Sequence, residues 1–141
     1  MKTLIENARL IDGLAAEPAG GLSLLIEDGS IAEIGPAIAP DGADVTIDAA
    51  GKTVMPGLID AHLHLMGIRA YDPVLASIED PFLRAARGVA DVRKLIEAGF
   101  TAVRCAGSNL GVSLNAAVEE GTIPGPRIVA SHLAISQTAG H

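Results

Sequence analysis

The spacing of apolar residues changes at Pro56-Gly57, and this change decides which folds the 141-residue chain can adopt. Before it, short apolar runs alternate with turns, and Asp28-Gly29 between two such runs is a strong hairpin signal. After it, segments typical of strands alternate with segments typical of helices, which indicates parallel strands joined by right-handed crossovers. We therefore predict a small antiparallel β-sandwich module over residues 1–55 and an α/β part over residues 56–141.

Turn residues and apolar spacing give the expected elements. Strands are expected over residues 3–11, 22–28, 31–34, 45–48, 53–55, 58–64, 101–104 and 128–131. A shorter helix is expected over 114–120. A long helix is expected to begin at the N-cap Asp80 and to end at Gly99, with an apolar face formed by Phe82, Ala86, Val89, Val92 and Ile96. Three parallel strands cannot close a (β/α)8 barrel, which takes about 250 residues, so we expect an incomplete piece of a larger fold.

The composition argues against several classes of protein. The formal net charge of −7 disfavours a nucleic-acid partner, because phosphate binding requires clustered Lys and Arg. The single cysteine, Cys105, cannot form an internal disulfide. No apolar stretch in the sequence reaches the roughly 18 residues of a membrane-spanning helix, and charges interrupt the N-terminus too early for a signal peptide. We expect a cytoplasmic protein with no membrane partner.

The segment His62-Leu63-His64 carries the strongest chemical signal. Side chains at positions i and i+2 of a strand point to the same face, with Cα atoms roughly 6.6 Å apart, so the two imidazoles can converge on one cation. Asp60 falls on the same face of a regular strand, where it could orient a ligand histidine or form a hydrogen bond elsewhere in the floor of the site. Taken alone, two histidines at this spacing are more often plain polar residues.

The residues around the two histidines resemble those of a known family. The run from Thr53 to His64 is similar to the signature V-x-P-G-[LF]-I-D-x-H-x-H of the amidohydrolase superfamily. Residues 98–104 resemble the second barrel strand of that family. Residues 120–127 and 135–141 resemble its imidazolonepropionase-like branch, which includes Xaa-Pro dipeptidases and ochratoxinase-type amide hydrolases. The resemblance implies the first strands and helices of a (β/α)8 TIM-like barrel, preceded by the small β module.

The resemblance also implies a chemistry. His62 and His64 match the first two ligands of one or two divalent metal ions, usually zinc, while later strands supply the other ligands and the general base. The metal activates a water molecule that attacks an amide carbon. We therefore expect a hydrolase of small-molecule amides, with N-acyl amino acids or Xaa-Pro-type dipeptides as substrates. The complete protein is expected to form a homo-oligomer, and this chain alone is expected to be inactive.

Two alternatives to this function stay open. Related enzymes open cyclic amides such as imidazolones, lactams and ureides, so the substrate could be cyclic. The chain could also be a non-catalytic binding protein or one subunit of a split enzyme. Its strand edges would then need a partner, because exposed flat edges invite aggregation.

Four further residues are candidates for the site. Arg104 could bind a substrate carboxylate or pair with an internal acidic group. His132 follows a predicted strand where relatives more often have glycine, and His141 ends a Thr-Ala-Gly-His run that matches the branch. Each of these histidines is expected either to line the substrate pocket or to hold its loop. Cys105 stands where many relatives have aspartate; we interpret it as a small buried residue rather than a nucleophile, with a thiol metal ligand as the remaining alternative.

Overall fold

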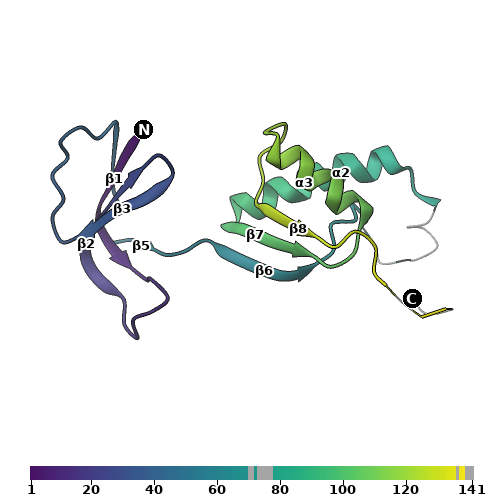
Figure 1. Ribbon diagram of the computed structural model, residues 1–141, viewed down its shortest axis with the longest axis horizontal. Coiled ribbons are helices and arrows are strands. Elements are labelled where there is room, and N and C mark those ends of the chain that lie inside the picture. Colours follow the sequence, from purple (N-terminus) through teal and green to yellow (C-terminus); the bar gives the residue numbers. More distant parts are fainter. Residues whose placement is uncertain (70–71, 73–77, 136, 139–141) are drawn as a thin grey trace. The chain divides into compact units, whose positions relative to one another are not determined.

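The chain forms two compact units, Met1–Pro56 and Gly57–His141. The computed structural model describes residues 1–69, 72, 78–135 and 137–138 (Figure 1). Each unit has its own sheet and its own buried core. No helix within the described residues is both long and apolar enough to cross a membrane.

The first unit is a single sheet of five strands with the order β3-β2-β1-β4, and β5 also pairs with β1. The strands are β1 (Lys2–Leu10), β2 (Ala19–Glu27), β3 (Ser30–Gly35), β4 (Val45–Asp48) and β5 (Thr53–Val54). The β1–β2 and β2–β3 pairs are antiparallel, as predicted, whereas β4 and β5 run parallel to β1. The sheet is therefore mixed, because the connection over residues 36–44 returns the chain to the end of the sheet where β1 begins.

A side-chain hydrogen bond ties β1 to the end of β4. Asn7 has a positive φ of 54°, and its amide donates to the Asp48 carboxylate at 3.0 Å. The Ala50 N–H donates to the same oxygen at 2.8 Å. These bonds, the Asn7 bond foremost, lower the pKa of Asp48 below its usual value. The stabilisation they give is present above the ordinary carboxyl pKa and is lost as the pH falls through the lowered one.

The second unit alternates strands and helices. Its elements are β6 (Leu58–Leu63), α2 (Pro81–Glu97), β7 (Phe100–Cys105), α3 (Asn109–Glu119) and β8 (Arg127–Ala130). The strands form a parallel sheet with the order β6-β7-β8 (Figure 1). Both helices pack on the same face of this sheet, where the buried core consists of Leu65, Val92, Val103, Cys105, Leu114 and Ile128.

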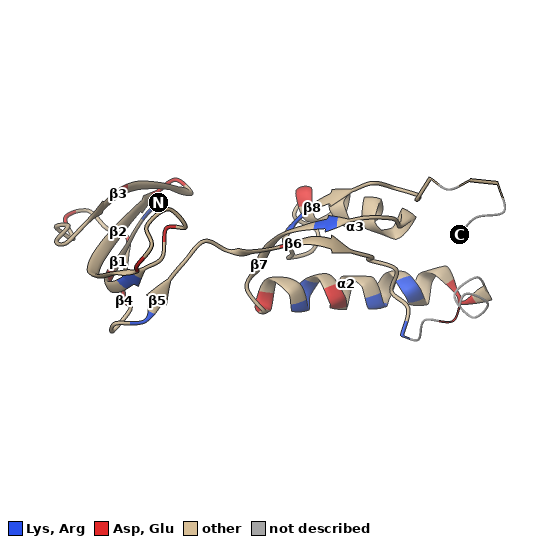
Figure 2. Ribbon diagram, turned by 90° about the horizontal axis from the view of Figure 1, so that it is seen from below, with Lys and Arg blue, Asp and Glu red and all other residues tan. Residues whose placement is uncertain are grey.

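The beginning of α2 agrees with the prediction, whereas its packing face agrees only in part. The Asp80 carboxylate accepts hydrogen bonds from the N–H groups of Phe82 and Leu83 at 2.9 Å, which is the expected N-cap. The buried residues of α2 are Gly88 and Val92, whereas Phe82 is 81% exposed. Charged residues of both signs alternate along the helix (Figure 2).

The packing face of α2 is set by a small residue rather than by the largest apolar ones. A Cβ atom at Gly88 would lie 2.9 Å from Leu110 Cδ2 and 3.1 Å from Leu114 Cδ1, so glycine lets these two side chains of α3 pack against α2 without shifting. Apolar spacing alone cannot reveal this contact. Of the predicted face, Val92 is buried and Ile96 half-buried, whereas Phe82, Ala86 and Val89 are exposed.

Helix α3 begins earlier than predicted. It starts at Asn109, five residues before Leu114, and the Ser108 side chain accepts a hydrogen bond from the Gly111 N–H as its N-cap. Gly111 weakens the helical pattern of this turn, but the fold requires it. A Cβ at Gly111 would lie 2.7 Å from Cys105 Sγ, so the first turn of α3 packs directly on β7.

Candidate functional site

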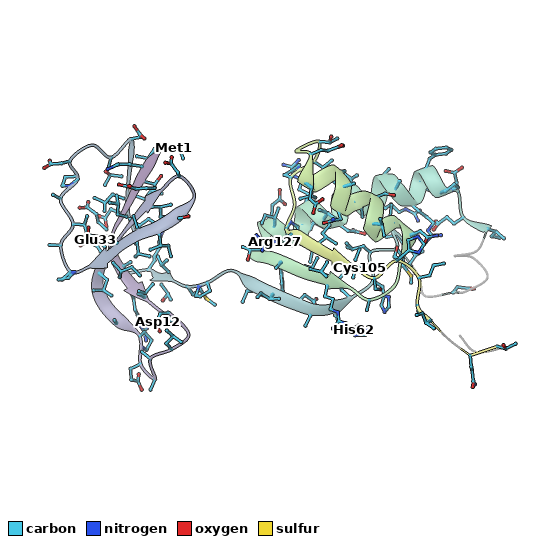
Figure 3. All side chains as sticks on the ribbon, viewed as in Figure 1. Met1, Asp12, Glu33, His62, Cys105 and Arg127 are labelled. Atoms are coloured by element: carbon cyan, nitrogen blue, oxygen red, sulfur yellow. The ribbon has the colours of Figure 1, made fainter. Side chains whose placement is uncertain are left out.

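The candidate residues gather at the carboxyl end of the parallel sheet. Val103 and Cys105 of β7 are buried under the helices, so Arg104 between them lies on the opposite face. His62 and His64 flank Leu63, which packs against the helical core, and both histidines are exposed. In Figure 3, His62 lies on the side of β6 away from the helices.

The two imidazole rings stand side by side. Their centroids are 5.3 Å apart and their planes make an angle of 72°. A zinc–nitrogen bond of about 2.0–2.1 Å places each ring centre about 3.2 Å from the metal, so two imidazoles at a tetrahedral angle have centres about 5.2 Å apart. The separation of His62 and His64 therefore fits joint ligation of one divalent cation.

The ring of His64 is held by the main chain of the loop after β7. Its Nδ1 lies 3.1 Å from the carbonyl oxygen of Gly107. A carbonyl only accepts hydrogen bonds, so Nδ1 carries the proton and donates it. Nε2 of His64 is then the lone-pair nitrogen, which is the form that ligates metals.

Asp60 contacts the main chain of His62 rather than the imidazole. Its Oδ1 accepts a hydrogen bond from the His62 N–H at 3.0 Å. Ala61 and His62 both lie opposite Arg104, because the register of β6 shifts between Asp60 and Leu63. The regular alternation that would place Asp60 on the face of the histidines is therefore interrupted. Bulges of this kind re-aim side chains next to active sites.

This contact predicts how Asp60 variants behave. In the full-length protein, Asp60→Ala is expected to lower the free energy of unfolding by about 0.5–1.5 kcal/mol, because the His62 N–H loses its acceptor. Asp60→Asn keeps an acceptor oxygen and is expected to cost much less. Urea unfolding of both variants measures the difference. An equal loss in both would show that the carboxylate charge, rather than the hydrogen bond, is what matters.

The other four candidate residues lie in different surroundings, and one of them is not described by the structure. No ion pair of Arg104 is found among the residues that the structure describes. His132 has a φ of 69°, a conformation that favours glycine, and its carbonyl accepts a hydrogen bond from the Ser108 N–H. Cys105 is fully buried, and its Sγ accepts from the Leu65 N–H at 3.4 Å. His141 lies outside the described residues.

A cavity of about 810 Å³ opens beside His64, between the first turns of α2 and α3. This volume suits a small-molecule ligand. Its lining is mainly apolar and includes Met66, Phe82, Leu110 and Leu133.

Sequence reasoning missed the residues that hold His64. Gly107 acts through its carbonyl and Ser108 through hydrogen bonds to residues 43 positions away, so neither has a local chemical signature. The usable signal was Ser108 itself, because serine before an apolar periodic run marks a helix N-terminus. Among the described residues, no group of three or more His, Cys, Asp or Glu side chains could hold a metal. The described part of the chain thus offers a pair of candidate ligands.

Comparison with known sequences identifies the family. Residues 53–141 match the sequence profile of the amidohydrolase family. A dihydroorotase of Geobacter sulfurreducens is 40% identical over 123 residues, which are 84% of this chain and 25% of that protein.

Known structures give the same result. The crystal structure of an amidohydrolase matches all of this chain with a TM-score of 0.90 and 39% identity, over 34% of its own chain. A Xaa-Pro dipeptidase with methionine bound in the active site also matches all of it, with a TM-score of 0.88 and 32% identity, over 36% of its own chain. The chain thus spans about a quarter of the curated relative and about a third of these structures. The predicted α/β fold class is confirmed, although the first unit is a single mixed sheet rather than the antiparallel sandwich that was predicted. The chain belongs to the amidohydrolase family.

Proposed function

We propose that the protein to which this chain belongs is a metal-dependent hydrolase of small-molecule amides that carry a carboxylate, such as N-acyl amino acids or Xaa-Pro-type dipeptides. The observation that carries the proposal is the pair of exposed imidazoles at 5.3 Å, one of which has its Nδ1 bound to a carbonyl. Strand spacing alone can bring two side chains this close, so the hydrogen bond that fixes the ring of His64 is what supports a metal site over two plain polar residues.

His62 and His64 would hold the divalent cation, for which zinc is our choice because it prefers imidazole ligands. Such a cation polarises a substrate carbonyl and lowers the pKa of water towards neutrality. The chain's own residues prepare the site. Gly107 holds the His64 ring through Nδ1, and Asp60 fixes the strand segment that carries His62. The other ligands and the proton-transferring group are expected outside this chain, and a homo-oligomer in the cytoplasm stays a prediction.

The preference for a carboxylate rests on Arg104. Its guanidinium lies on the same face of the sheet as His62, directly across from the bulge, and no acidic side chain in the described part of the chain neutralises it. A planar guanidinium binds carboxylates through paired hydrogen bonds. The similar Xaa-Pro dipeptidase structure holds methionine, an amino acid with a carboxylate, in its active site.

A cyclic amide is the second candidate. It is favoured by the curated relatives, several of which are dihydroorotases, including the one at 40% identity. Assaying the zinc-loaded full-length protein on N-acyl amino acids, Xaa-Pro dipeptides and dihydroorotate distinguishes the two candidates. Turnover of the linear amides that stops with a chelator is the expected result. Turnover of the cyclic compound alone would replace the first proposal by the second, and no turnover of either class would overturn both.

Arg104 gives a sharper test of the substrate class. Arg104→Met is expected to raise KM for a carboxylate substrate at least about tenfold, because one charged hydrogen-bonding partner is worth roughly 1.5–3 kcal/mol. KM for the matching carboxamide should hardly change. Arg127 lies on the same sheet face but at the beginning of β8, so Arg127→Met is the matched control. Equal effects of the two variants would argue against carboxylate binding by Arg104.

A further inference from the structure

The segment that carries His64 is joined to the segment after β7 by four hydrogen bonds. These are Ala106 N to Leu63 O at 2.8 Å, His64 Nδ1 to Gly107 O at 3.1 Å, Leu65 N to Cys105 Sγ at 3.4 Å, and Ser108 Oγ to Leu65 O at 2.6 Å. They hold the residue before His64, its ring, and the residue after it. The orientation of this imidazole therefore depends on residues 105–108.

Ser108 makes one of these four bonds through its hydroxyl and shares the peptide group whose carbonyl makes another. Its hydroxyl donates to Leu65 O and accepts from the Gly111 N–H at 3.3 Å, and the residue as a whole is only 6% exposed. A buried hydroxyl with both roles filled cannot be removed without leaving polar groups unpaired. By the same two bonds the hydroxyl fixes the beginning of α3 against the loop that follows His64.

The peptide group between Gly107 and Ser108 is the part that meets the site. Its carbonyl accepts from Nδ1 of His64, and its N–H donates to the carbonyl of His132. One planar group therefore bridges the loops after β6 and β8. If that group rotated, the His64 ring would lose the acceptor that selects its tautomer.

We propose that Ser108 is a positioning residue, whose hydroxyl fixes the 107–108 peptide so that Gly107 holds Nδ1–H of His64 and leaves Nε2 for the cation. This inference deepens the proposed function and rests on it for the identity of the ligand. Ser108 itself has no contact with the cation. It acts on metal affinity only through the ring of His64.

The test uses the full-length protein freed of metal. Ser108→Ala is expected to weaken zinc binding about 10- to 100-fold, the usual cost of losing a group that orients a metal-bound histidine. Titration with zinc against a chromophoric chelator measures the affinity. Long-range ¹H–¹⁵N spectra of labelled histidines give a second readout that does not depend on activity. His64 is expected to be the Nδ1–H tautomer in the parent protein and a mixture in the variant.

Two further variants separate positioning from helix capping. Ser108→Gly removes the same hydroxyl, but glycine starts a helix better than alanine, so this variant keeps the fold if Ser108→Ala does not. Asp80→Ala removes the N-cap of α2. The Asp80 carboxylate accepts hydrogen bonds within the first turn of its own helix, as the Ser108 hydroxyl does, but it has no bond to residues 63–65. Zinc affinity and the His64 tautomer should change in both Ser108 variants and stay at the parental values in Asp80→Ala.

The outcomes separate failure of this inference from failure of the proposed function. Parental affinity and tautomer in the Ser108 variants, or an equal loss in Asp80→Ala, would overturn the positioning role. If His64→Ala also binds zinc as tightly as the parent protein, the metal assignment itself fails. If only His64→Ala loses zinc, the site stands and Ser108 is a helix cap and nothing more.

Discussion

Replacing His62 with alanine in the full-length protein is expected to abolish metal loading and hydrolase activity together. A bound divalent metal would lower the pKa of water towards neutrality, so its loss should reduce kcat/KM by at least about a thousandfold. His62 is exposed and its ring lies beside that of His64 at the surface, so the fold should survive. Elemental analysis of the purified variant and an assay under saturating zinc measure the two effects.

The control for this experiment is the stability of the metal-free protein. Its unfolding midpoint should be the same with His62 or alanine, because the substitution removes no buried contact. Full metal occupancy in His62→Ala would contradict the ligand assignment. A lower unfolding midpoint for metal-free His62→Ala than for the metal-free parent protein would show that His62 is structural instead.

Gly67→Ala is expected to be the most destabilising single-methyl substitution in the second unit. Gly67 has a φ of +64°, and a Cβ there would lie 2.0 Å from the carbonyl oxygen of Arg84 in α2. Backbone cannot yield as a flexible side chain does, so strain and crowding add to about 3 kcal/mol or more. The free energy of unfolding of the full-length protein, from denaturant titration, gives the value.

Gly121 provides the matched substitution. Its φ is +78°, close to that of Gly67, but a Cβ there meets nothing within 4 Å. Gly121→Ala should therefore show the conformational cost alone, about 1–2 kcal/mol. The difference between the two variants isolates the contact with α2. If both variants lost the same free energy of unfolding, α2 would be able to move away from the added methyl group, and the close approach at Gly67 would contribute nothing to stability.

Local sequence determines some parts of this structure well. The alternation after Pro56 predicts the parallel sheet, and the Asp80-Pro81 pair predicts the beginning of α2. Both signals act within a few residues, where backbone chemistry decides the outcome. The spacing of His62 and His64 likewise predicts that the two rings lie together, since strand geometry leaves few alternatives.

The parts that could not be predicted depend on contacts between distant segments. The face of α2 is set by Gly88 meeting α3, and the position of Asp60 by a bulge in β6. The bond of His64 to Gly107 joins residues 43 positions apart and uses a carbonyl that every residue possesses. No property of the side chain at 107 could have indicated it. Periodicity assigns elements, but it does not say which backbone groups meet.

The hydrogen bonds between residues 63–65 and 105–108 have a practical consequence for protein engineering. Randomising positions 105 and 108 in a variant library would remove the two side chains that take part in those bonds, so we expect most members to lose the fixed orientation of His64. Positions 82, 110 and 133 line the cavity and take no part in those bonds. Substitutions intended to change substrate selectivity should therefore be made at these three positions. A loop transferred into or out of this protein should include both residues 63–65 and residues 105–108, because the two segments are joined by hydrogen bonds.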